Sequence, residues 1–448
     1  MKQTGHIKAP GNWINDPNGF IYYRGRYHVF YQHFPYEPRW GTMHWGHAVS
    51  TDLIHWEHLP IALYPTKPQD RNGCFSGSAV EHDGKLYLFY TGVRYHQENP
   101  ENIHKHVDND FESCQMLMVS DDGEHFDNLN AKRVIIPKIT DPEVGDVTHT
   151  RDPKVWRGSD AWYMVLGSTR HGEGELLIYR SRDLTTWELA GQAELPGIGW
   201  MWECPDWFTV DGQGVLLFSP MGYMKDCACP PDMSLCALAD FDEKTCTLRM
   251  ADDGHFFDYG LDLYAPQSAL DAEGRRIVIA WLRMPGPVDE GGCPWRGMMC
   301  LPRVVSVCDG RVRFSVHPDV RAAYAHPIAT PSEAGNGGFR MTLELHDGEV
   351  LDIGGYRIAR AGGRLRADRS AVCPHNGKCR LVSETPEIRE GDHLEIYVDG
   401  NIVETYVNDG EYTLTHAVYG LGDDIHLEGS GPIALYALEK KCLSPFSR

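Results

Sequence analysis

The sequence has no apolar run long enough to cross a membrane, no cluster of basic residues and no regular cysteine spacing. The first of these absences excludes a transmembrane helix, so we expect no membrane partner. The 42 Lys and Arg residues are outnumbered by 63 Asp and Glu residues, which gives a formal net charge of −21. A negative surface without basic clusters repels phosphate backbones, and we therefore expect no nucleic acid partner.

The 13 cysteines form no pattern typical of a disulfide framework or a zinc site, and their number is odd. Cys227 and Cys229 make a lone Cys-x-Cys sequence. Cys373 and Cys379 flank His375, but the paired Cys-x-x-Cys spacing of a structural zinc site is missing from both places. We expect neither a bound metal nor a cofactor.

Residues 1–10 are polar and lack the apolar centre of a signal peptide. The most informative motif already begins at Trp13, which leaves no room for such a peptide before it. We therefore expect a cytoplasmic protein with reduced thiols. Nothing in the sequence indicates the oligomeric state.

Aromatic residues, glycine and proline are what the sequence has in quantity. It contains 12 Trp, 21 Tyr and 15 Phe residues beside 46 Gly and 28 Pro residues. Many turn-forming residues between aromatic segments favour short strands over long helices. The aromatic rings fit an ordinary β core, but also a sugar-binding site, since the flat faces of sugars stack on such rings.

A hairpin-like pattern recurs five times, as a strand, a turn centred on Gly or Asp, and a second apolar strand. The copies span residues 19–31, 77–92, 152–167, 204–220 and 267–282. Three of them are followed by a second pattern, a Ser- and Asp-containing turn before an aromatic residue, at residues 50–56, 120–126 and 181–187. We expect each of these aromatic residues to start the outermost strand of a four-stranded unit.

Five such units in order predict a five-bladed β-propeller with loop insertions. The alternative is a β-sandwich whose hairpins resemble one another by chance. After about residue 325 the pattern changes to strands of period two, such as residues 341–345, 393–398 and 402–407, with Asp399-Gly400-Asn401 as a hairpin turn. The chain is therefore predicted to be all-β, with a propeller over residues 1–325 and a β-sandwich domain over residues 326–448.

Three of the hairpins open on an acid followed closely by proline: Asp16-Pro17, Asp152-Pro153 and Glu203-Cys204-Pro205. Proline holds the preceding residue extended, which helps to orient a carboxylate at the start of a strand. The innermost strands of all propeller blades run in the same direction, so these acids are expected to converge at one end of the central channel. Paired carboxylates are what the hydrolysis of a glycosidic bond requires.

Other side chains near these acids are suited to a small polyol. Hydrogen bonds to hydroxyl groups are expected from Asn15, Gln32, Ser76 and Arg151, and aromatic walls from Trp13, Trp40, Phe75 and Trp202. Each of these residues alone has a plainer interpretation, as a turn, a core residue or an ion-pair partner. The prediction depends on their joint placement.

Four segments resemble the signature motifs of glycoside hydrolase family 32, which includes invertases, sucrose 6-phosphate hydrolases and fructanases. They are residues 13–19 (WINDPNG), 75–78 (FSGS), 151–153 (RDP) and 202–205 (WECP), and residues 258–267 and 301–303 look like later motifs of the family. Residues 40–47 and 73–77 are most similar to the bacterial intracellular members that act on sucrose and sucrose 6-phosphate. The resemblance extends over the first 300 or so residues, and more loosely into residues 398–410.

The resemblance implies a role for each matched position. Asp16 would be the nucleophile, Glu203 the acid/base, and Asp152 the residue that holds ring hydroxyls and stabilises the transition state. Cys204 would help to adjust the acidity of Glu203, although a small buried cysteine is an equal interpretation. Tyr264 and Trp281 are further expected substrate-binding residues.

The expected function is that of a retaining β-fructofuranosidase, which hydrolyses the terminal β-D-fructofuranoside bond of sucrose, sucrose 6-phosphate or short fructo-oligosaccharides through a covalent fructosyl-enzyme intermediate. The expected partner is thus a small saccharide. Two alternatives stay open: a propeller glycosidase for another furanoside, and a carbohydrate-binding propeller without catalysis.

Overall fold

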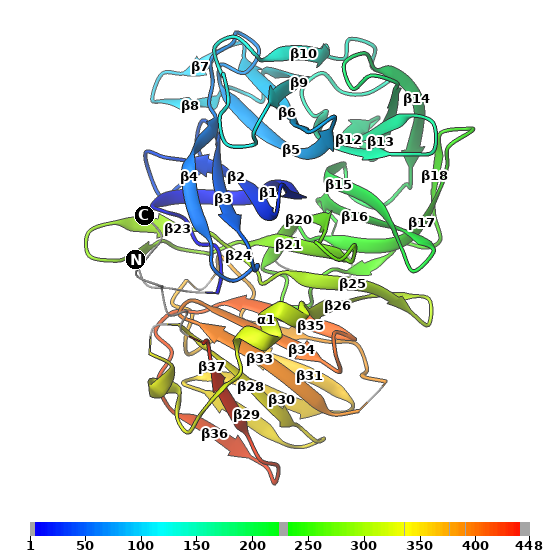
Figure 1. The fold of residues 1–448 in the computed structure, drawn as a ribbon. Coiled ribbons are helices and arrows are strands. Elements are labelled where there is room, and N and C mark those ends of the chain that lie inside the picture. The colour runs from blue at the N-terminus through cyan, green and yellow to red at the C-terminus, as the bar shows by residue number, and fades with distance from the viewer. Residues whose placement is uncertain (1–4, 224–231, 336, 376, 390, 440–448) are drawn as a thin grey trace.

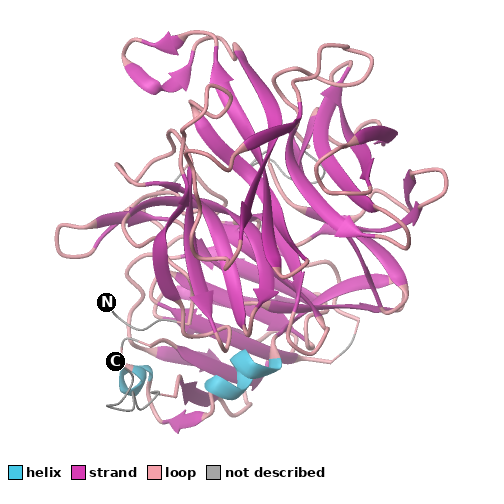
Figure 2. Cartoon of the chain, turned by 45° about the horizontal axis from the view of Figure 1, so that its top comes forward, coloured by secondary structure: helices cyan, strands magenta, loops and turns pink. Residues whose placement is uncertain are grey.

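The structure, a computed structural model, describes residues 5–223, 232–335, 337–375, 377–389 and 391–439. Cys227 and Cys229 lie outside the described residues. The described chain is built almost entirely of antiparallel strands in two parts, a ring of sheets and a pair of stacked sheets beneath it in Figure 1. Figure 2 shows how little of it is helical: the short helix α1 (Pro318–Ala323) and the 3-10 turn η1 (Pro331–Ala334).

The ring consists of five four-stranded sheets, called blades here. Short additional strands extend blades 1, 4 and 5. Blade 1 contains β1 (Asn12–Tyr23), β2 (Arg26–Phe34), β3 (His44–Ser50) and β4 (Glu57–Leu63), with β22 (Val288–Asp289) and β23 (Pro294–Arg296) beside β1. Blade 2 contains β5 (Gly73–His82), β6 (Lys85–Tyr95), β9 (Phe111–Ser120) and β10 (Arg133–Ile136). Between β6 and β9 the chain makes a separate hairpin of β7 (Glu98–Asn99) and β8 (Asn102–His106).

Blades 3 to 5 follow the same order along the chain. Blade 3 contains β11 (Arg151–Arg157), β12 (Trp162–Arg170), β13 (Glu173–Ser181) and β14 (Glu188–Glu194). Blade 4 contains β15 (Met201–Val210), β16 (Gln213–Met221), β17 (Leu235–Asp242) and β18 (Thr247–Met250), with β19 (His255–Phe256) paired to β17. Blade 5 contains β20 (Leu263–Leu270), β21 (Arg276–Leu282), β25 (Arg303–Cys308) and β26 (Arg311–Val316), with β24 (Met298–Met299) paired to β21.

The first strand of each blade lies at the centre of the ring. β1 contacts β5, β5 contacts β11, β11 contacts β15, β15 contacts β20, and β20 returns to β1. This closed cycle of five inner strands is that of a five-bladed propeller, which confirms the predicted fold class. All five predicted hairpins are present as the first two strands of a blade.

The second pattern forms a recurring turn held by side chains. The hydroxyl of Ser50 accepts a hydrogen bond from the amide of Leu53, and Asp52 accepts hydrogen bonds from the amides of Ile54 and His55. Equivalent bonds hold the turns after Ser120 and Ser181.

Two of these turns lead directly into the outermost strand, with Trp56 just before β4 and Trp187 just before β14. The prediction was wrong for Phe126, because β10 begins only at Arg133. A further turn separates Phe126 from β10. In it, Asp127 accepts hydrogen bonds from the amides of Leu129 and Asn130.

The second part is a sandwich of two antiparallel sheets. One sheet contains β27 (His326–Ile328), β37 (Ala434–Ala437), β28 (Phe339–Glu344), β33 (His393–Asp399), β34 (Ile402–Val407) and β35 (Tyr412–Ala417). The other contains β32 (Val382–Glu384), β31 (Arg364–Asp368), β30 (Tyr356–Ala361), β29 (Val350–Ile353) and β36 (Ile425–Glu428). The predicted turn at Gly400 joins β33 to β34.

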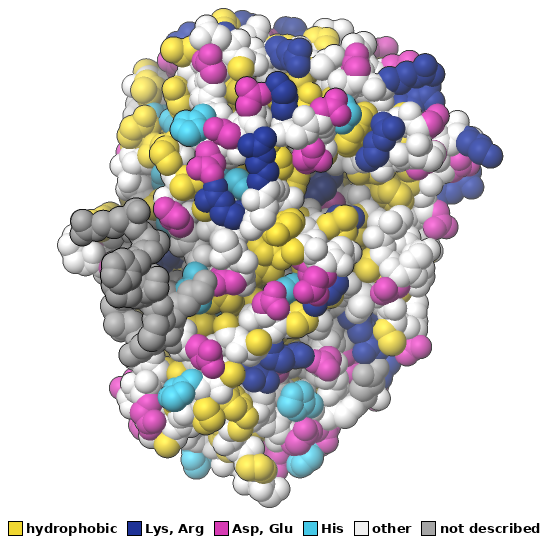
Figure 3. All heavy atoms as spheres, viewed as in Figure 1, with side chains coloured by type: hydrophobic (Ala, Val, Ile, Leu, Met, Phe, Trp, Pro, Cys, Tyr) yellow, Lys and Arg dark blue, Asp and Glu magenta, His cyan; other side chains and the backbone are white. Residues whose placement is uncertain are grey.

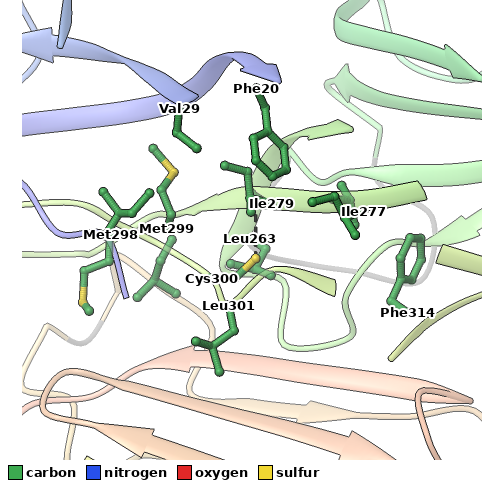
Figure 4. Packing of buried hydrophobic residues seen from close by; sticks show 14 of the residues in the cluster. Phe20, Val29, Leu263, Ile277, Ile279, Met298, Met299, Cys300, Leu301 and Phe314 are labelled. Atoms are coloured by element: carbon green, nitrogen blue, oxygen red, sulfur yellow. Dashed lines mark hydrogen bonds between the residues drawn. The ribbon is translucent and has the colours of Figure 1, made fainter. Parts of the chain in front are cut away.

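Apolar side chains fill the spaces between neighbouring blades. Phe30 and Leu88 belong to the core between blades 1 and 2, and Phe89 and Met164 to the core between blades 2 and 3. The largest cluster joins blades 4, 5 and 1 and reaches the sandwich. Figure 4 shows its centre, where side chains of β21 and β24 pack against Phe20 and Val29. Packing between blades keeps the inner strands in place around the channel.

A buried polar network connects the two parts of the molecule. Arg303 on β25 donates hydrogen bonds to Asp258 over 3.0 Å and to Glu404 on β34 over 2.7 Å. His6 lies between Glu404 and Asp399, at 2.9 and 2.7 Å. Burial alone would lower the pKa of His6, but the hydrogen bonds and charges of the two carboxylates outweigh it and raise the pKa to about 9. The network therefore holds a protonated histidine at neutral pH.

On the face seen in Figure 3, Lys and Arg side chains are interspersed with Asp and Glu side chains. Within the described residues, no helix has the length and apolar character needed to cross a membrane.

Candidate active site

The inner strands start at one mouth of the central channel, and a cavity of about 300 Å³ lies there. Its lining comes from all five blades: Asn15, Asp16, Gln32, Trp40, Phe75, Ser76, Tyr95, His106, Asn109, Phe111, His149, Arg151, Asp152, Glu203, Tyr264 and Trp281. The volume is at the lower end of the range for small-molecule sites. Asp16, Asp152 and Glu203, which the sequence places far apart, therefore share one cavity.

Each of the five inner strands is irregular at the same level. The pairing with the second strand shifts between Ile14 and Pro17, Phe75 and Gly77, Arg151 and Lys154, Glu203 and Asp206, and Tyr264 and Gln267. The residues skipped by the pairing include Asp16, Ser76, Asp152, Cys204 and Ala265. Such β-bulges turn side chains away from the regular alternation and are common beside active sites.

Proline follows the skipped residue in four of these strands, at positions 17, 153, 205 and 266. Because proline lacks an N–H group, it is tolerated where a strand has lost its regular pairing. Asp152, Cys204 and Ala265 also have positive φ angles of 66°, 48° and 53°. This conformation is unfavourable for a residue with a Cβ atom, so the fold maintains local backbone strain at the site.

Asp16 is half-buried and accepts hydrogen bonds from a hydroxyl and an amide side chain. Ser76 donates to Oδ2 over 2.6 Å, and Asn15 donates to Oδ1 over 3.0 Å. Burial raises the pKa of Asp16, and the charge of Glu203 raises it further, whereas the bonds from Ser76 and Asn15 lower it. The two donors favour the ionised carboxylate that a nucleophile requires.

Asp152 is buried beside Cys204. The backbone amide of Cys204 donates to Oδ2 of Asp152 over 2.9 Å. The thiol of Cys204 lies 3.5 Å from the same oxygen and 3.6 Å from Oδ2 of Asp16, so it bridges the two acids. Burial is the main reason why the pKa of Asp152 is raised to about 7. Cys204 itself is half-buried, and its desolvation raises the pKa of the thiol well above the ordinary value, so it acts here as a neutral donor.

Glu203 is held from both sides. Arg151 donates to Oε1 through Nη2 at 2.7 Å and through Nε at 3.2 Å, and the hydroxyl of Tyr264 donates to Oε2 over 2.6 Å. Both carboxylate oxygens are thus fixed by neighbouring blades. Arg151 also lies 3.9 Å from Asp152, so a single cation compensates two of the three acids.

Aromatic rings form the wall of the cavity near Asp16. Trp40 and Phe75 meet edge to face with ring centroids 5.9 Å apart. Trp281 contacts Trp13 in the same way at 5.6 Å. Such rings can bind the apolar faces of a sugar while the carboxylates and amides bind its hydroxyl groups.

Most residues predicted from the sequence line the cavity, and two lie just behind it. Trp13 is buried and supports Asn15, whose side-chain oxygen accepts a 2.7 Å hydrogen bond from the indole nitrogen. Cys204 lies beneath the acids, as described above. Gln32 reaches the cavity but uses its amide nitrogen to donate to the carbonyl of Cys74.

The expectation that Trp202 forms a wall of the cavity was wrong. Trp202 is only 1% exposed and packs on Phe218 in the core between blades 3 and 4. Its indole nitrogen donates to the carbonyl of Ile198. Alternation along β15 explains the difference, because Trp202 and Glu203 are adjacent and point to opposite faces.

Five lining residues were not predicted: Tyr95, His106, Asn109, Phe111 and His149. Four of them lie between the last residue of β6 and the first residue of β9, a stretch that includes the β7–β8 hairpin, and His149 comes from the loop before β11. These segments lie outside the recurring motifs. The chain between the second and third predicted hairpins, residues 93–151, is long enough to contain an insertion that could reach the site.

Among the residues that the structure describes, no group of three or more His, Cys, Asp or Glu side chains is placed to hold a metal ion. The cation nearest to the acids is the guanidinium of Arg151.

The cavity of this propeller contains three carboxylates, an arginine and aromatic rings. Hydrolysis of a glycosidic bond uses a pair of carboxyl groups, so these residues are those expected of a glycoside hydrolase. Comparison with known proteins supports the same class. Residues 6–318 match the model of the "Glycosyl hydrolases family 32 N-terminal domain", and residues 327–440 match that of the "Glycosyl hydrolases family 32 C terminal". The chain belongs to glycoside hydrolase family 32.

Individual relatives match over most of their length. The chain is 36% identical over 445 residues to a sucrose-6-phosphate hydrolase of Escherichia coli, which covers 92% of this chain and 88% of that protein. It is 35% identical over 456 residues to a raffinose invertase of Escherichia coli, covering 96% and 91%. Among solved structures, a Bombyx mori GH32 beta-fructofuranosidase has a TM-score of 0.80 and 27% identity, covering 97% of this chain and 93% of that one.

Proposed function

We propose that the chain is a retaining β-fructofuranosidase that hydrolyses the terminal β-D-fructofuranoside bond of sucrose, sucrose 6-phosphate or short fructo-oligosaccharides. The observation that carries the proposal is the meeting of Asp16, Asp152 and Glu203 at one mouth of the channel. Membership of family 32 and the names of the relatives, a sucrose-6-phosphate hydrolase and a raffinose invertase, support this substrate class.

In the proposed mechanism Asp16 attacks the anomeric carbon of the fructosyl unit and forms a covalent ester. Its hydrogen bonds from Ser76 and Asn15 support this role, because they stabilise the carboxylate and hold it in one orientation. The ester exists only briefly, since water then hydrolyses it and restores the free carboxylate.

Glu203 is the proposed acid/base. It protonates the departing oxygen in the first step and activates the attacking water in the second. The contacts from Arg151 and Tyr264 support this assignment, since they hold both oxygens of the carboxyl group in place at the cavity. Asp152 is proposed to bind ring hydroxyls of the fructosyl unit and to stabilise the positive charge that develops on it.

We further propose a cytoplasmic location and a division into a catalytic domain over residues 1–325 and a sandwich domain over residues 326–448. The described cysteines are free thiols, which supports a reducing compartment. The boundary is supported by the last propeller strand, β26, which ends at Val316, and by β27 of the sandwich, which begins at His326.

Fructose release from sucrose, sucrose 6-phosphate and 1-kestose by the purified chain tests the function. Asp16→Ala should reduce the rate by at least about 10³-fold, because the covalent route is lost. Asp160→Ala, which changes an exposed acid in a turn, is the matched control and should keep full activity. A folded protein that releases fructose from none of the three substrates contradicts the proposal.

The acid/base assignment needs a separate test. Glu203→Gln should reduce sucrose hydrolysis by about 10²–10⁴-fold. With 4-nitrophenyl β-D-fructofuranoside, whose leaving group needs little acid assistance, added azide should restore part of the rate and yield a β-fructosyl azide. Retention also predicts that methanol, as an alternative acceptor, gives methyl β-fructofuranoside as the first product. An α-configured product would contradict the covalent mechanism.

A further inference from the structure

His149 is a lining residue that the proposed mechanism does not use. It lies in the loop before β11, and its Nδ1 is 3.3 Å from Nη1 of Arg151. The same guanidinium holds Glu203 through Nη2 and Nε. His149 therefore stands on the Glu203 side of the cavity, whereas Asp16 is held by Asn15 and Ser76 of blades 1 and 2. This is the side from which the leaving group would depart.

We propose that His149 donates a hydrogen bond to a hydroxyl group of the departing sugar and thereby gives the enzyme its preference for a sugar leaving group. The inference rests on the proposed function and adds a recognition residue to it.

The contact with Arg151 determines which nitrogen of His149 carries the proton. A guanidinium group has only donors, so the ring nitrogen that faces it must accept. In a neutral imidazole the other nitrogen then carries the hydrogen and can only donate. His149 lines the cavity, and its Nε2 is accordingly an N–H donor suited to the oxygen of a hydroxyl group.

The surroundings keep this ring neutral. Burial, and next to it the positive charge of Arg151, lower the pKa of His149 to about 4. At pH 5 to 8 the side chain is thus a neutral donor with a defined tautomer. A neutral donor suits the uncharged hydroxyls of a sugar.

Two aromatic rings hold the imidazole in place. Trp200 meets it edge to face with ring centroids 5.0 Å apart, and Phe111 does so from the second blade at 5.8 Å. Trp200 is 36% exposed, so this group lies at the rim of the cavity, where a leaving group would remain in contact with solvent. A fixed ring loses little entropy when it forms a hydrogen bond.

The test compares two substrates with one fructosyl unit and different leaving groups. Sucrose has a hydroxylated leaving group, and 4-nitrophenyl β-D-fructofuranoside has an aryl group without sugar hydroxyls. His149→Phe keeps an aromatic ring but removes the donor, and should lower kcat/KM for sucrose about tenfold. The value for the aryl fructoside should change by less than about twofold.

His149→Gln is the rescuing variant, because its amide can accept from Arg151 and donate to the sugar at once. It should keep most of the activity on sucrose. Inhibition of aryl fructoside hydrolysis by D-glucose is a second readout, and His149→Phe should weaken it about tenfold. His426→Phe, an exposed histidine on β36 of the sandwich, is the matched control.

Equal losses on both substrates in His149→Phe would overturn the inference. A loss on sucrose alone, without weaker inhibition by D-glucose, would overturn it too, because it would place the effect on the acid role of Glu203, which an aryl leaving group needs little. Unchanged activity on both substrates would overturn it as well. If the unaltered protein hydrolysed neither substrate, the proposed function itself would fail, which is a distinct outcome.

Discussion

The hydroxyl of Ser76 donates a hydrogen bond of 2.6 Å to Oδ2 of Asp16 and so joins the inner strand of blade 2 to that of blade 1 at the mouth of the channel. A hydroxyl that donates to a carboxylate stabilises its charged form. Burial acts in the opposite direction on Asp16. The bond from the neighbouring blade thus lowers the pKa of the proposed nucleophile and offsets part of the rise that burial causes.

Ser76→Ala should move the acid limb of the pH–activity profile to higher pH. Ser76 lowers the pKa of Asp16, so its removal lets the pKa rise, and a larger fraction of Asp16 is protonated and inactive at low pH. We expect kcat/KM to fall about tenfold at pH 5 and by less at pH 7. Measurement of kcat/KM from pH 4 to 8 checks this. Ser78→Ala, in the same strand, should leave the limb where it is.

Tyr264→Phe should lower kcat with little change in KM. The variant keeps the ring but removes the 2.6 Å hydrogen bond to Oε2 of Glu203, which leaves that oxygen less well positioned. A loss of about 10- to 100-fold in kcat is expected. Tyr23→Phe is the control. It removes a hydroxyl that donates to the carbonyl of Gly84, at the end of β1 that lies away from Asp16. A rise in KM alone would contradict the positioning role.

The network around His6 predicts a loss of stability at alkaline pH. The folded-state pKa of about 9 lies above the unfolded value of 6.5. The stabilisation is therefore complete below pH 6.5 and disappears as the pH rises through 9, and it amounts to about 3 kcal/mol. Urea denaturation from pH 6 to 10 should show this fall, and His6→Gln should show a flatter curve. A steep alkaline fall that persists in His6→Gln would contradict the assignment.

Buried histidines in blade 1 should cause a second loss of stability, at acid pH. Burial lowers the pKa of His28, His44 and His58 to about 4, below the unfolded value of 6.5. The unfolded chain then binds more protons, so stability falls as the pH drops from 6.5 towards 4, by up to about 3 kcal/mol for one histidine. His58→Gln should lessen the fall in the urea midpoint between pH 7 and 4.5. An unchanged slope would show that His58 is protonated in the folded state.

The order of the blades could be read from the sequence because hairpins and turns are local. The Asp-Pro and Glu-Cys-Pro motifs also marked positions that lie at the bulges. The same bulge at Ala265-Pro266 carries no acid, so proline marks the backbone irregularity and does not by itself mark a functional residue.

Other features depend on contacts that the linear pattern does not contain. Trp202 and Glu203 are adjacent on a strand, so when Glu203 faces the cavity Trp202 faces the core between the blades. The motif alone does not tell which of the two side chains faces the cavity. His149 acquires its place from Arg151, Phe111 and Trp200, which only the folded chain brings together. The late start of β10 follows from the extra turn at Asp127.

The bulges of the five inner strands place bond cleavage and recognition of the departing sugar on different parts of the chain. The proposed chemical groups are fixed to the backbone of the ring, which the packing of all five blades keeps rigid. His149, which is proposed to contact the departing sugar, comes from the loop before β11, and the lining residues His106 and Asn109 come from the segment between β6 and β9. Surface segments of this kind tolerate insertions and substitutions. Exchange of these segments between members of the family should therefore change which fructoside is chosen without rebuilding the machinery that cleaves it.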